Sequence, residues 1–394
     1  MKTPESSSHP SPSSELRILV VDDSVAVRRA LTEAIEREPG MSLCGAAPNG
    51  ALGLELLSRT NPDVIVLDLA MPVVDGLDFL TRMRPEYPRL PVLVFSGTVG
   101  HANEATLEAL WRGASDYLLK PEGLPPGAMD AFLRAQLFPR LRALVQPRAG
   151  SSVRPATAAA PPPAPLDPRA RPAEPVAFSL ARPAAGPDPL PSMLVVGAST
   201  GGPRALAAAV GELPRDYALP IAIVQHMPAE MTEFFAAGLA ANCRLPVRIA
   251  EDRGAVSPGV IWVAPGGTHL VLEADRERVR FRLDTGPEEN GCRPAVDPLF
   301  RSAAHVYGPG TLALVLTGMG QDGLAGARAV HAAQGRVLVQ DEASSVVWGM
   351  PGAVARAGLA HAILPLSLLG GELRARARRI LRALDGDGPQ AEAA

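Results

Sequence analysis

Short runs of apolar residues alternate with helical patterns through the first third of the chain. Segments such as 25–37 and 102–112 carry apolar residues at three- and four-residue spacing, which is typical of a helix with one buried face. Because the runs between them are continuously apolar, we expect parallel strands covered on both faces, in a doubly wound, flavodoxin-like α/β domain. The predicted strands are residues 16–21, 42–47, 64–69, 91–96 and 116–120.

A second block of apolar runs lies closer to the C-terminus, at residues 193–385. The runs MLVV, IAIVQ and TLALVL predict strands, and glycine-rich segments follow the first and the third of them. The pattern predicts a second α/β domain with a doubly wound parallel sheet, of the Rossmann-like kind.

The composition changes abruptly between the two blocks, at residues 146–192. Proline and alanine supply about half of this stretch, and it has almost no periodic apolar pattern. Such a segment cannot bury enough apolar surface to offset the entropy of ordering it, so we predict a flexible linker. The Ser/Pro-rich residues 1–14 predict a disordered tail. The predicted domains are therefore residues 15–145 and 193–385.

The overall composition narrows the classes of function. The chain has 394 residues, of which 47% are hydrophobic, and a formal net charge of −3, so it lacks the basic excess of a nucleic-acid binder. No apolar run approaches the ~20 residues of a membrane helix. Cys44, Cys243 and Cys292 show no metal or disulfide spacing and are interpreted as small buried residues. We expect a soluble cytoplasmic protein that is not inserted in a membrane and does not bind nucleic acid.

Charged residues follow the strands predicted for the first domain. Asp22 and Asp23 follow the first strand, and Asp68 ends the third. Three carboxylates at one sheet edge would repel each other without a hard cation, and Mg²⁺ suits such oxygen ligands. Ser96 ends the fourth strand and Lys120 the fifth; there are only two lysines among 38 basic residues, and a compact ammonium suits a small anion. Taken singly, each aspartate is also consistent with a helix cap.

The motifs VVDDS, DLAMPVVDGLDFL and YLLKP together resemble the receiver domain of two-component response regulators, over essentially all of residues 15–145. The resemblance implies that a histidine kinase phosphorylates Asp68 and that this carboxylate helps to hold Mg²⁺. It further implies that Asp22 and Asp23 also bind the metal and that Ser96 and Lys120 contact the phosphoryl group. Tyr117 corresponds to the aromatic switch residue of the family.

A candidate nucleophile lies at the start of the second domain, in the motif GASTGG. The glycines permit a tight turn and Pro203 presets a helical turn, so Ser199 is predicted on the bend between a strand and a helix. The start of this helix also supplies backbone N–H groups for an oxyanion. An ordinary turn serine is one alternative. A dinucleotide-binding loop is another, but Ser199 replaces its second glycine and the next strand ends in His226 rather than an acid.

The serine needs a base, and the base needs an orienting carboxylate. His226 follows the strand next to that of the serine, so their side chains are expected at the same edge. Asp322 lies in the glycine-rich loop TGMGQDG after a third strand. Asp297 is a rival that is also consistent with a helix N-cap. Asp341 and Asp252 also follow strands but have no glycine-rich loop before them.

The motifs GASTGG, QHM, RPAVDPLF, TGMGQDG and VVWGMP, behind a receiver and a linker, closely resemble the chemotaxis receptor methylesterase/deamidase family. The resemblance implies that Ser199 is the nucleophile, His226 the general base and then acid, and Asp322 the orienting carboxylate. It implies that Thr200 and Met319 stabilise the oxyanion or position the histidine. The implied reactions are hydrolysis of glutamate methyl esters and deamidation of glutamines on chemoreceptors, without a cofactor for the esterase chemistry.

The resemblance also implies control by a chemotaxis histidine kinase, with the unphosphorylated receiver lying across the serine. Three alternatives stay open. A DNA-binding response regulator would need a basic recognition helix after the linker, which the sequence does not show. A catalytically silent adaptor would keep the serine without activity. An esterase for a non-chemotaxis receptor array or a small molecule would share the same motifs.

Overall fold

The computed structural model describes residues 15–97, 102–123, 125, 127–145, 180–181, 189–275 and 278–384. The predicted tail and most of the predicted linker lie outside these residues. The elements of the two sheets fall on either side of the linker, and the four domain boundaries themselves stay a prediction. No helix in the described parts of the chain is long and apolar enough to cross a bilayer.

The first half is a five-stranded, fully parallel sheet in the order β2-β1-β3-β4-β5, as the apolar pattern predicted. Its strands are β1 (Leu16–Val21), β2 (Met41–Ala47), β3 (Val64–Leu67), β4 (Val92–Ser96) and β5 (Asp116–Leu119). The predicted third strand ran to residue 69, but β3 ends two residues earlier because the Asp68 carboxylate accepts a hydrogen bond from the backbone N–H of Leu69 at 2.8 Å and turns the chain.

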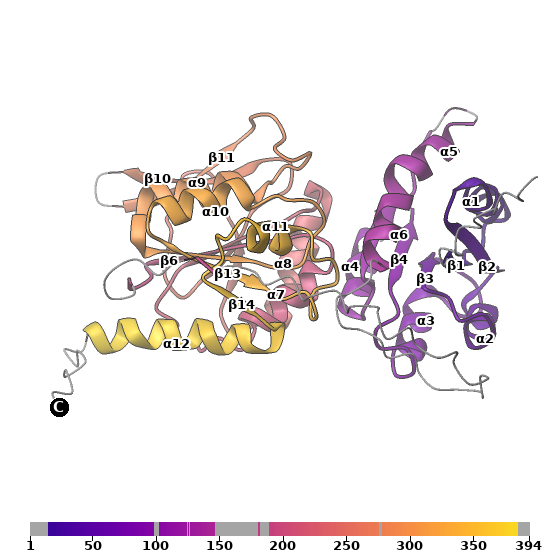
Figure 1. Cartoon of the computed structure of the whole chain (residues 1–394), viewed down its shortest axis with the longest axis horizontal. Helices are drawn as coiled ribbons and strands as arrows, with labels where there is room; N and C mark the ends of the chain where they lie inside the picture. The colour runs from indigo at the N-terminus through magenta and orange to yellow at the C-terminus, as the bar shows by residue number, and fades with distance from the viewer. Residues whose placement is uncertain are drawn as a thin grey trace, which may run out of the picture.

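Helices cover both faces of this sheet (Figure 1). They are α1 (Val25–Arg37), α2 (Gly50–Thr60), α3 (Gly76–Met83) and α4 (Ala102–Trp111), followed by α5 (Ala128–Phe132), the π-helical η1 (Leu133–Leu137) and α6 (Phe138–Val145). The last three follow one another without a break and end the first half of the chain.

The second half is built on a seven-stranded parallel sheet in the order β14-β13-β12-β6-β7-β9-β8. Its strands are β6 (Met193–Ala198), β7 (Ile221–Gln225), β8 (Val247–Ile249), β9 (Ile261–Val263), β12 (Thr311–Val315), β13 (Arg336–Gln340) and β14 (Ala362–Leu364). An antiparallel hairpin, β10 (His269–Asp275) and β11 (Arg278–Asp284), packs beside it. The predicted doubly wound sheet is confirmed. The strand order reverses around β6, the place where α/β sheets bind ligands.

The helices of this half are α7 (Gly202–Val210), η2 (Ala229–Met231), α8 (Thr232–Ala241), α9 (Val296–Tyr307), η3 (Gly308–Gly310), α10 (Leu324–Ala332), α11 (Met350–Arg356) and α12 (Leu366–Leu384). Alternate residues of β6 point to two buried clusters. Leu194 and Val196 cluster with residues of α7 and α12, whereas Met193 and Val195 cluster with residues of α9, α10 and α11.

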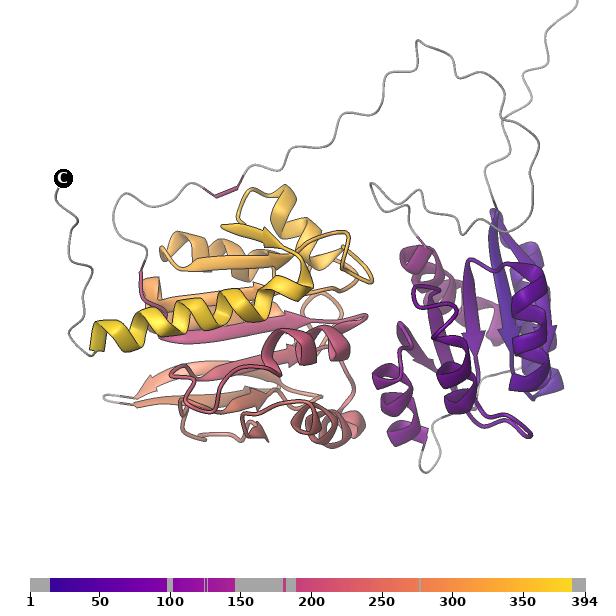
Figure 2. The same cartoon turned by 90° about the horizontal axis from the view of Figure 1, so that it is seen from below.

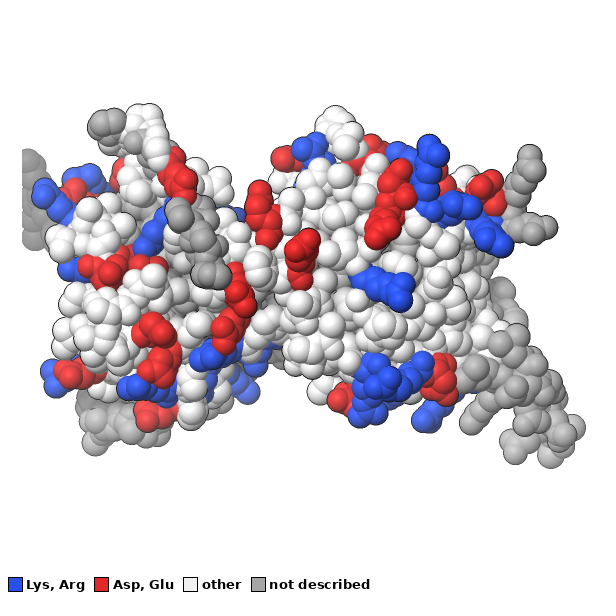
Figure 3. Space-filling view, turned by 180° about the vertical axis from the view of Figure 1, so that it is seen from behind, with Lys and Arg blue, Asp and Glu red and all other residues white. Residues whose placement is uncertain are grey.

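The two halves lie side by side, with α4 and α6 facing the second sheet (Figures 1 and 2). Helix α4 packs against α7 and α8, and the ring of Trp111 stacks on Phe235 with 6.2 Å between centroids and 11° between planes. Seen from behind, acidic and basic side chains are interspersed over both halves, around broad uncharged areas (Figure 3).

Candidate functional site

Ser199 lies on the turn that joins β6 to α7. Its backbone N–H donates to the carbonyl of Thr317 at 3.0 Å, which ties the turn to the neighbouring β12 loop, and its own carbonyl accepts from Gly202 N at 2.7 Å. Gly201 has φ +75°, and a Cβ there would come within 2.5 Å of the Val346 side chain, so this position requires glycine. The glycines therefore hold the serine at the carboxyl end of its strand.

His226 and Asp322 meet at the same edge. The parallel pairing of β6 with β7 places Ala198 opposite Gln225, and the backbone N–H of His226 donates to the Ala198 carbonyl at 3.1 Å. On the other side of β6, the loop after β12 brings Asp322 Oδ2 to 2.7 Å from His226 Nε2. Three residues that are far apart in sequence are thus held by three adjacent strands.

The structure separates Asp322 from its rival Asp297. Asp322 accepts hydrogen bonds from the N–H groups of Val296 at 2.6 Å and Asp297 at 3.1 Å, so it caps α9 from outside that helix. The N-cap interpretation of Asp297 is wrong, because α9 begins one residue earlier with Ala295 at the N-cap. The Asp297 carboxylate instead accepts from Gly326 N at 2.6 Å and from the Asn290 amide at 3.0 Å.

The surroundings of the ion pair shift the pKa values of both His226 and Asp322. Burial alone would lower the pKa of His226, but the hydrogen bond to Asp322 and the contact with Cys292 outweigh it and raise this pKa to about 9. Burial would raise the pKa of Asp322, yet the hydrogen bonds from His226 and from the backbone of α9 hold it below its ordinary value. The carboxylate therefore stays ionised beside the imidazole.

Two residues of this site had no signal in the sequence. Cys292 is half-buried rather than a buried core residue, and its Sγ lies 3.5 Å from His226 Nδ1, the ring nitrogen that faces away from Asp322. The Asn290 amide donates to Asp322 Oδ1 at 3.0 Å as well as to Asp297. Both residues come from one tight turn, in which Asn290 has φ +54° and Gly291 has φ +71°. An Asn-Gly pair predicts a turn, but the sequence does not predict which groups the Asn290 and Cys292 side chains contact.

A pocket of about 460 Å³ surrounds the candidate nucleophile, and both halves of the chain line it. Ser199, His226 and Cys292 come from the second half, while Tyr117 and Arg140 come from the first. Burial at this position raises the pKa of the Tyr117 hydroxyl. The site therefore faces the receiver-like half of the chain.

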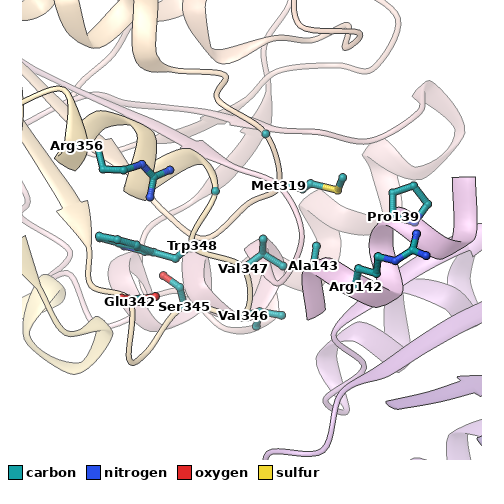
Figure 4. Close-up of a pocket in the computed structure, with 12 residues that line it drawn as sticks. Pro139, Arg142, Ala143, Met319, Glu342, Ser345, Val346, Val347, Trp348 and Arg356 are labelled. Atoms are coloured by element: carbon teal, nitrogen blue, oxygen red, sulfur yellow. The ribbon is translucent and has the colours of Figure 1, made fainter. Parts of the chain in front are cut away.

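Thr200 and Met319 occupy different sides of this region. The Thr200 hydroxyl donates to Asp116 Oδ2 at 2.9 Å, across the boundary between the two halves. Met319 is 40% exposed and lies in a second cleft, where it faces Pro139 of α6 (Figure 4). That cleft also contains Trp348, with the guanidinium of Arg356 5.6 Å from its ring centroid. An oxyanion role for Thr200 or Met319 stays a prediction.

The five charged and polar residues predicted in the first half also converge. Carboxylate oxygens of Asp22, Asp23 and Asp68 all lie within 4.8 Å of one another, which fits a small hard cation. Lys120 Nζ lies 2.8 Å from Asp22 Oδ2 and 2.7 Å from Asp68 Oδ2. Ser96 is buried at the end of β4 and lines one pocket with Asp23 and Lys120.

Burial raises the pKa of Asp68, and the pairing with Lys120 only partly offsets this effect. Burial lowers the pKa of Lys120, but its hydrogen bonds to Asp22 and Asp68 outweigh burial and raise it. The ammonium is therefore charged and holds two acids that would otherwise repel each other. The roles of these residues in phosphorylation stay a prediction.

Comparison with known proteins matches both halves. Residues 18–126 match the response regulator receiver domain family, and residues 194–373 match the CheB methylesterase family. A protein-glutamate methylesterase/protein-glutamine glutaminase of Trichodesmium erythraeum is 41% identical over 361 residues, covering 91% of this chain and 98% of its own.

A relative of the same name from Nocardioides sp. is 42% identical over 365 residues, covering 92% of this chain and 96% of its own. Among solved structures, the CheB methylesterase catalytic domain of Thermotoga maritima is 40% identical, with a TM-score of 0.46 over 47% of this chain and 98% of that one. With identities above 40% over nine tenths of its length, the chain belongs to the family of CheB methylesterases that carry a response regulator receiver domain.

Proposed function

We propose that this protein hydrolyses glutamate γ-methyl esters on chemoreceptors, and deamidates receptor glutamines, under the control of receiver phosphorylation in chemotaxis. The observation that carries the proposal is the partly buried ion pair of His226 with Asp322, 2.7 Å apart, at the sheet edge where Ser199 follows β6. The names and coverage of the relatives support the choice of substrate.

In the proposed reaction, Ser199 Oγ attacks the ester carbonyl while His226 takes its proton. Because Nε2 is bonded to Asp322, the proton is proposed to go to His226 Nδ1, which the Cys292 thiol faces at 3.5 Å in this structure. Asp322 stays ionised and stabilises the imidazolium. Backbone N–H groups at the start of α7, together with the Met319 N–H and Thr200, are proposed to stabilise the oxyanion.

Collapse of the tetrahedral intermediate breaks the C–O bond of the ester, and methanol leaves with the proton from His226. Water then attacks the acyl-enzyme with His226 as base, which releases the glutamate side chain and restores Ser199. With a glutamine substrate the C–N bond breaks instead and ammonia leaves. The esterase steps use only groups of this chain and need no cofactor.

In the receiver, Asp68 is the proposed acceptor of a phosphoryl group from a chemotaxis histidine kinase. Asp22, Asp23 and Asp68 would hold Mg²⁺, which supplies positive charge to the transferring phosphoryl group. Lys120 already contacts two of these carboxylates and would pair with the phosphoryl oxygens, while the Ser96 hydroxyl would donate to them. The new charge gives the receiver two states.

The contacts between the halves support a blocked state before phosphorylation. Asp116 and Thr200 share a hydrogen bond directly beside the nucleophile, and Trp111 stacks on Phe235. A bulky receptor helix would have to displace these contacts to reach Ser199. Phosphorylation at Asp68 would shift the equilibrium toward an undocked state, with a coupling of about 1–3 kcal/mol.

We place this activity in the cytoplasm, where kinase and receptor tails meet, and keep 15–145 and 193–385 as the two domains with a flexible linker between them. A catalytically silent adaptor and an esterase for a non-chemotaxis receptor array remain the alternatives. Some similar proteins belong to a group 2 operon, as does one of Rhodopseudomonas palustris, and this observation favours keeping the second alternative.

The test is methanol release from methylated receptor membranes. Ser199→Ala is expected to abolish turnover, whereas Asp68→Asn is expected to keep basal turnover and to lose stimulation by a phosphodonor. Ser58→Ala, on the surface of α2, is the matched control and should behave as the wild type. Retention of turnover in Ser199→Ala would contradict the proposed chemistry, and turnover on other methylated membranes alone would favour a different receptor array.

A further inference from the structure

Gln225 is the last residue of β7, and its side chain is buried between the candidate nucleophile and the candidate base. Only 4% of the residue is exposed. Its Nε2 donates to the backbone carbonyl of Ser199 at 3.0 Å and to that of His226 at 3.2 Å. One amide group therefore bridges the two residues that must exchange a proton in the proposed reaction.

The orientation of this amide follows from its partners. Both neighbours are carbonyl oxygens, which accept hydrogen bonds only, so the amide NH₂ must face them and the amide oxygen must point the other way. Gln225 Oε1 is buried and has no hydrogen-bond partner among the described residues. A buried acceptor without a partner destabilises the folded state. The side chain is thus kept in an arrangement that does not serve stability alone.

The first residue of α7 leaves room for this amide. A Cβ added to Gly202 would lie 1.8 Å from Gln225 Oε1 and 2.8 Å from its Cδ. Any side chain at position 202 would therefore displace Gln225 from the Ser199 carbonyl. Gly202 N already donates to that same carbonyl at 2.7 Å, so the Ser199 turn is held from the helix side and from the β7 side at once.

We propose that Gln225 is a positioning residue of the hydrolase reaction, whose amide fixes the Ser199 turn relative to the His226 backbone. It does not contact substrate, and it acts by holding the attacking oxygen in line with the imidazole. This inference rests on the proposed function of Ser199 and His226. A misplacement of about 1 Å between reacting groups costs on the order of 100-fold in rate, so a bridge at this place matters for turnover.

The test compares two buried polar residues of the same sheet in the full-length protein. Gln225→Met keeps the volume and removes the bridge. Thr311→Val is the control for lost stability, because Thr311 is equally buried at the start of β12, at the opposite end of the strands from Ser199, and its hydroxyl donates to the Ala303 carbonyl at 2.9 Å. Gly202→Ala is a second route to the same effect, since it pushes Gln225 aside.

Three quantities are measured for each variant: kcat and KM for methanol release, the rate of covalent trapping of Ser199 by an arylsulfonyl fluoride, and the melting temperature. We expect Gln225→Met and Gly202→Ala to lower kcat and the trapping rate about 10- to 100-fold with KM within about threefold. We expect Thr311→Val to lower the melting temperature comparably while both rates stay within about threefold.

Equal rate losses in Gln225→Met and Thr311→Val would overturn the proposal, because the effect would then follow stability. Wild-type trapping in Gln225→Met would overturn it as well. A Ser199→Ala arm separates this inference from the function beneath it. If Ser199→Ala still releases methanol, the proposed chemistry fails; if it does not and Gln225→Met is unaffected, only the role of Gln225 fails.

Discussion

Buried carboxylates lie at the carboxyl edges of both sheets, but different groups balance their negative charge. At the receiver edge, three carboxylates lie within 4.8 Å of one another and Lys120 is the cation that two of them share. At the second edge, Asp322 is satisfied by N–H groups of α9, by the Asn290 amide and by His226. The first site leaves excess negative charge for ligands to balance, whereas the second is balanced within the fold.

This difference matches what each site is proposed to do. A phosphoryl group adds up to two charges and needs side chains that exchange partners, which an ammonium shared by two carboxylates can do. Ester hydrolysis instead needs dipoles that are already in place when the charge develops. The same strand-end geometry thus suits the proposed switch in one half and the proposed catalytic group in the other.

The largest expected effect distinguishes the two acids beside Asn290. Asp322→Asn should lower kcat for methanol release by about 10⁴-fold, because a neutral amide stabilises the wrong histidine tautomer. Asp297→Asn should lower kcat by less than about tenfold, because that carboxylate touches α10 and Asn290 rather than the imidazole. Rates from purified protein with a methylated receptor membrane provide the measurement.

Melting curves of both variants are needed beside the rates, since each acid also accepts backbone N–H groups. If Asp297→Asn loses as much activity as Asp322→Asn at equal folded fraction, the assignment of the orienting carboxylate is wrong. The two edges would then be alike, because the second site would depend on two acids, Asp322 and Asp297, as the receiver site depends on several carboxylates.

Removing the receiver cation should have the next largest effect. Lys120→Met leaves Asp22 and Asp68 buried without a counter-ion, and we expect the receiver unfolding free energy to fall by about 3 kcal/mol. Millimolar Mg²⁺ should restore more stability in this variant than in the wild type, because a cation that binds only the folded state stabilises it by mass action. Urea titration with and without MgCl₂ measures both.

The control is Arg29→Met, which breaks an exposed ion pair with Glu33 on α1 and should leave the urea midpoint unchanged. If Lys120→Met is as stable as the wild type without Mg²⁺, the receiver carboxylates do not need the lysine. The fold around the receiver edge would then balance the negative charge of its carboxylates without Lys120, as the fold does at the second edge.

The sequence predicted both sheets and the residues at or just beyond the carboxyl ends of their strands, since these follow from continuous apolar runs and glycine-rich turns. It placed His226 beside Ser199 because parallel strands end at one edge, and it left Asp322 and Asp297 as rivals between which only the family resemblance chose. The structure brings His226 and Asp322 to 2.7 Å. The roles of Gln225, Asn290 and Cys292 could not be predicted, because a side chain's partners depend on how distant loops meet. The N-cap of α9 lies at Ala295, two residues before Asp297, and an apolar pattern cannot resolve a helix boundary to that precision.

The sequence pattern also could not predict how the two halves pack against each other. Trp111 reads as the last apolar residue of a receiver helix, yet its ring stacks on Phe235, and a Cβ at Gly238 would lie 2.3 Å from its Nε1. If docking blocks the active site, Trp111→Ala should raise the basal rate of methanol release about tenfold by weakening the closed state. The phosphorylated protein should change little.

Leu52→Ala, on an exposed position of α2 away from the second half, is the control for altering the receiver surface. A basal rate in Trp111→Ala equal to that of the wild type would show that this contact does not hold the closed state. A lower rate would mean that the receiver supports the catalytic half rather than covering it.

The smallest expected effect concerns the pH dependence at the balanced edge. His226 acts as a base only when neutral, so turnover rises as pH rises through its pKa, which is about 9 in the docked state. The groups in contact with its ring are Asp322 and Cys292, and both raise this pKa, while Arg140 and Asp116 face the same pocket. Cys292→Ala removes one raising contact, so the pKa should fall and the acid limb of the rate profile should move to lower pH.

At pH 7 this shift should appear as a gain of a few-fold in kcat/KM, because a larger fraction of His226 is neutral. Cys243→Ala, which changes the half-buried thiol after α8, is the matched control and should leave the profile in place. An acid limb that moves to higher pH in Cys292→Ala would contradict the prediction. It would mean that the Cys292 thiol lowers the pKa of His226 instead of raising it. Asp322 would then stabilise the imidazolium less than its contact with His226 indicates.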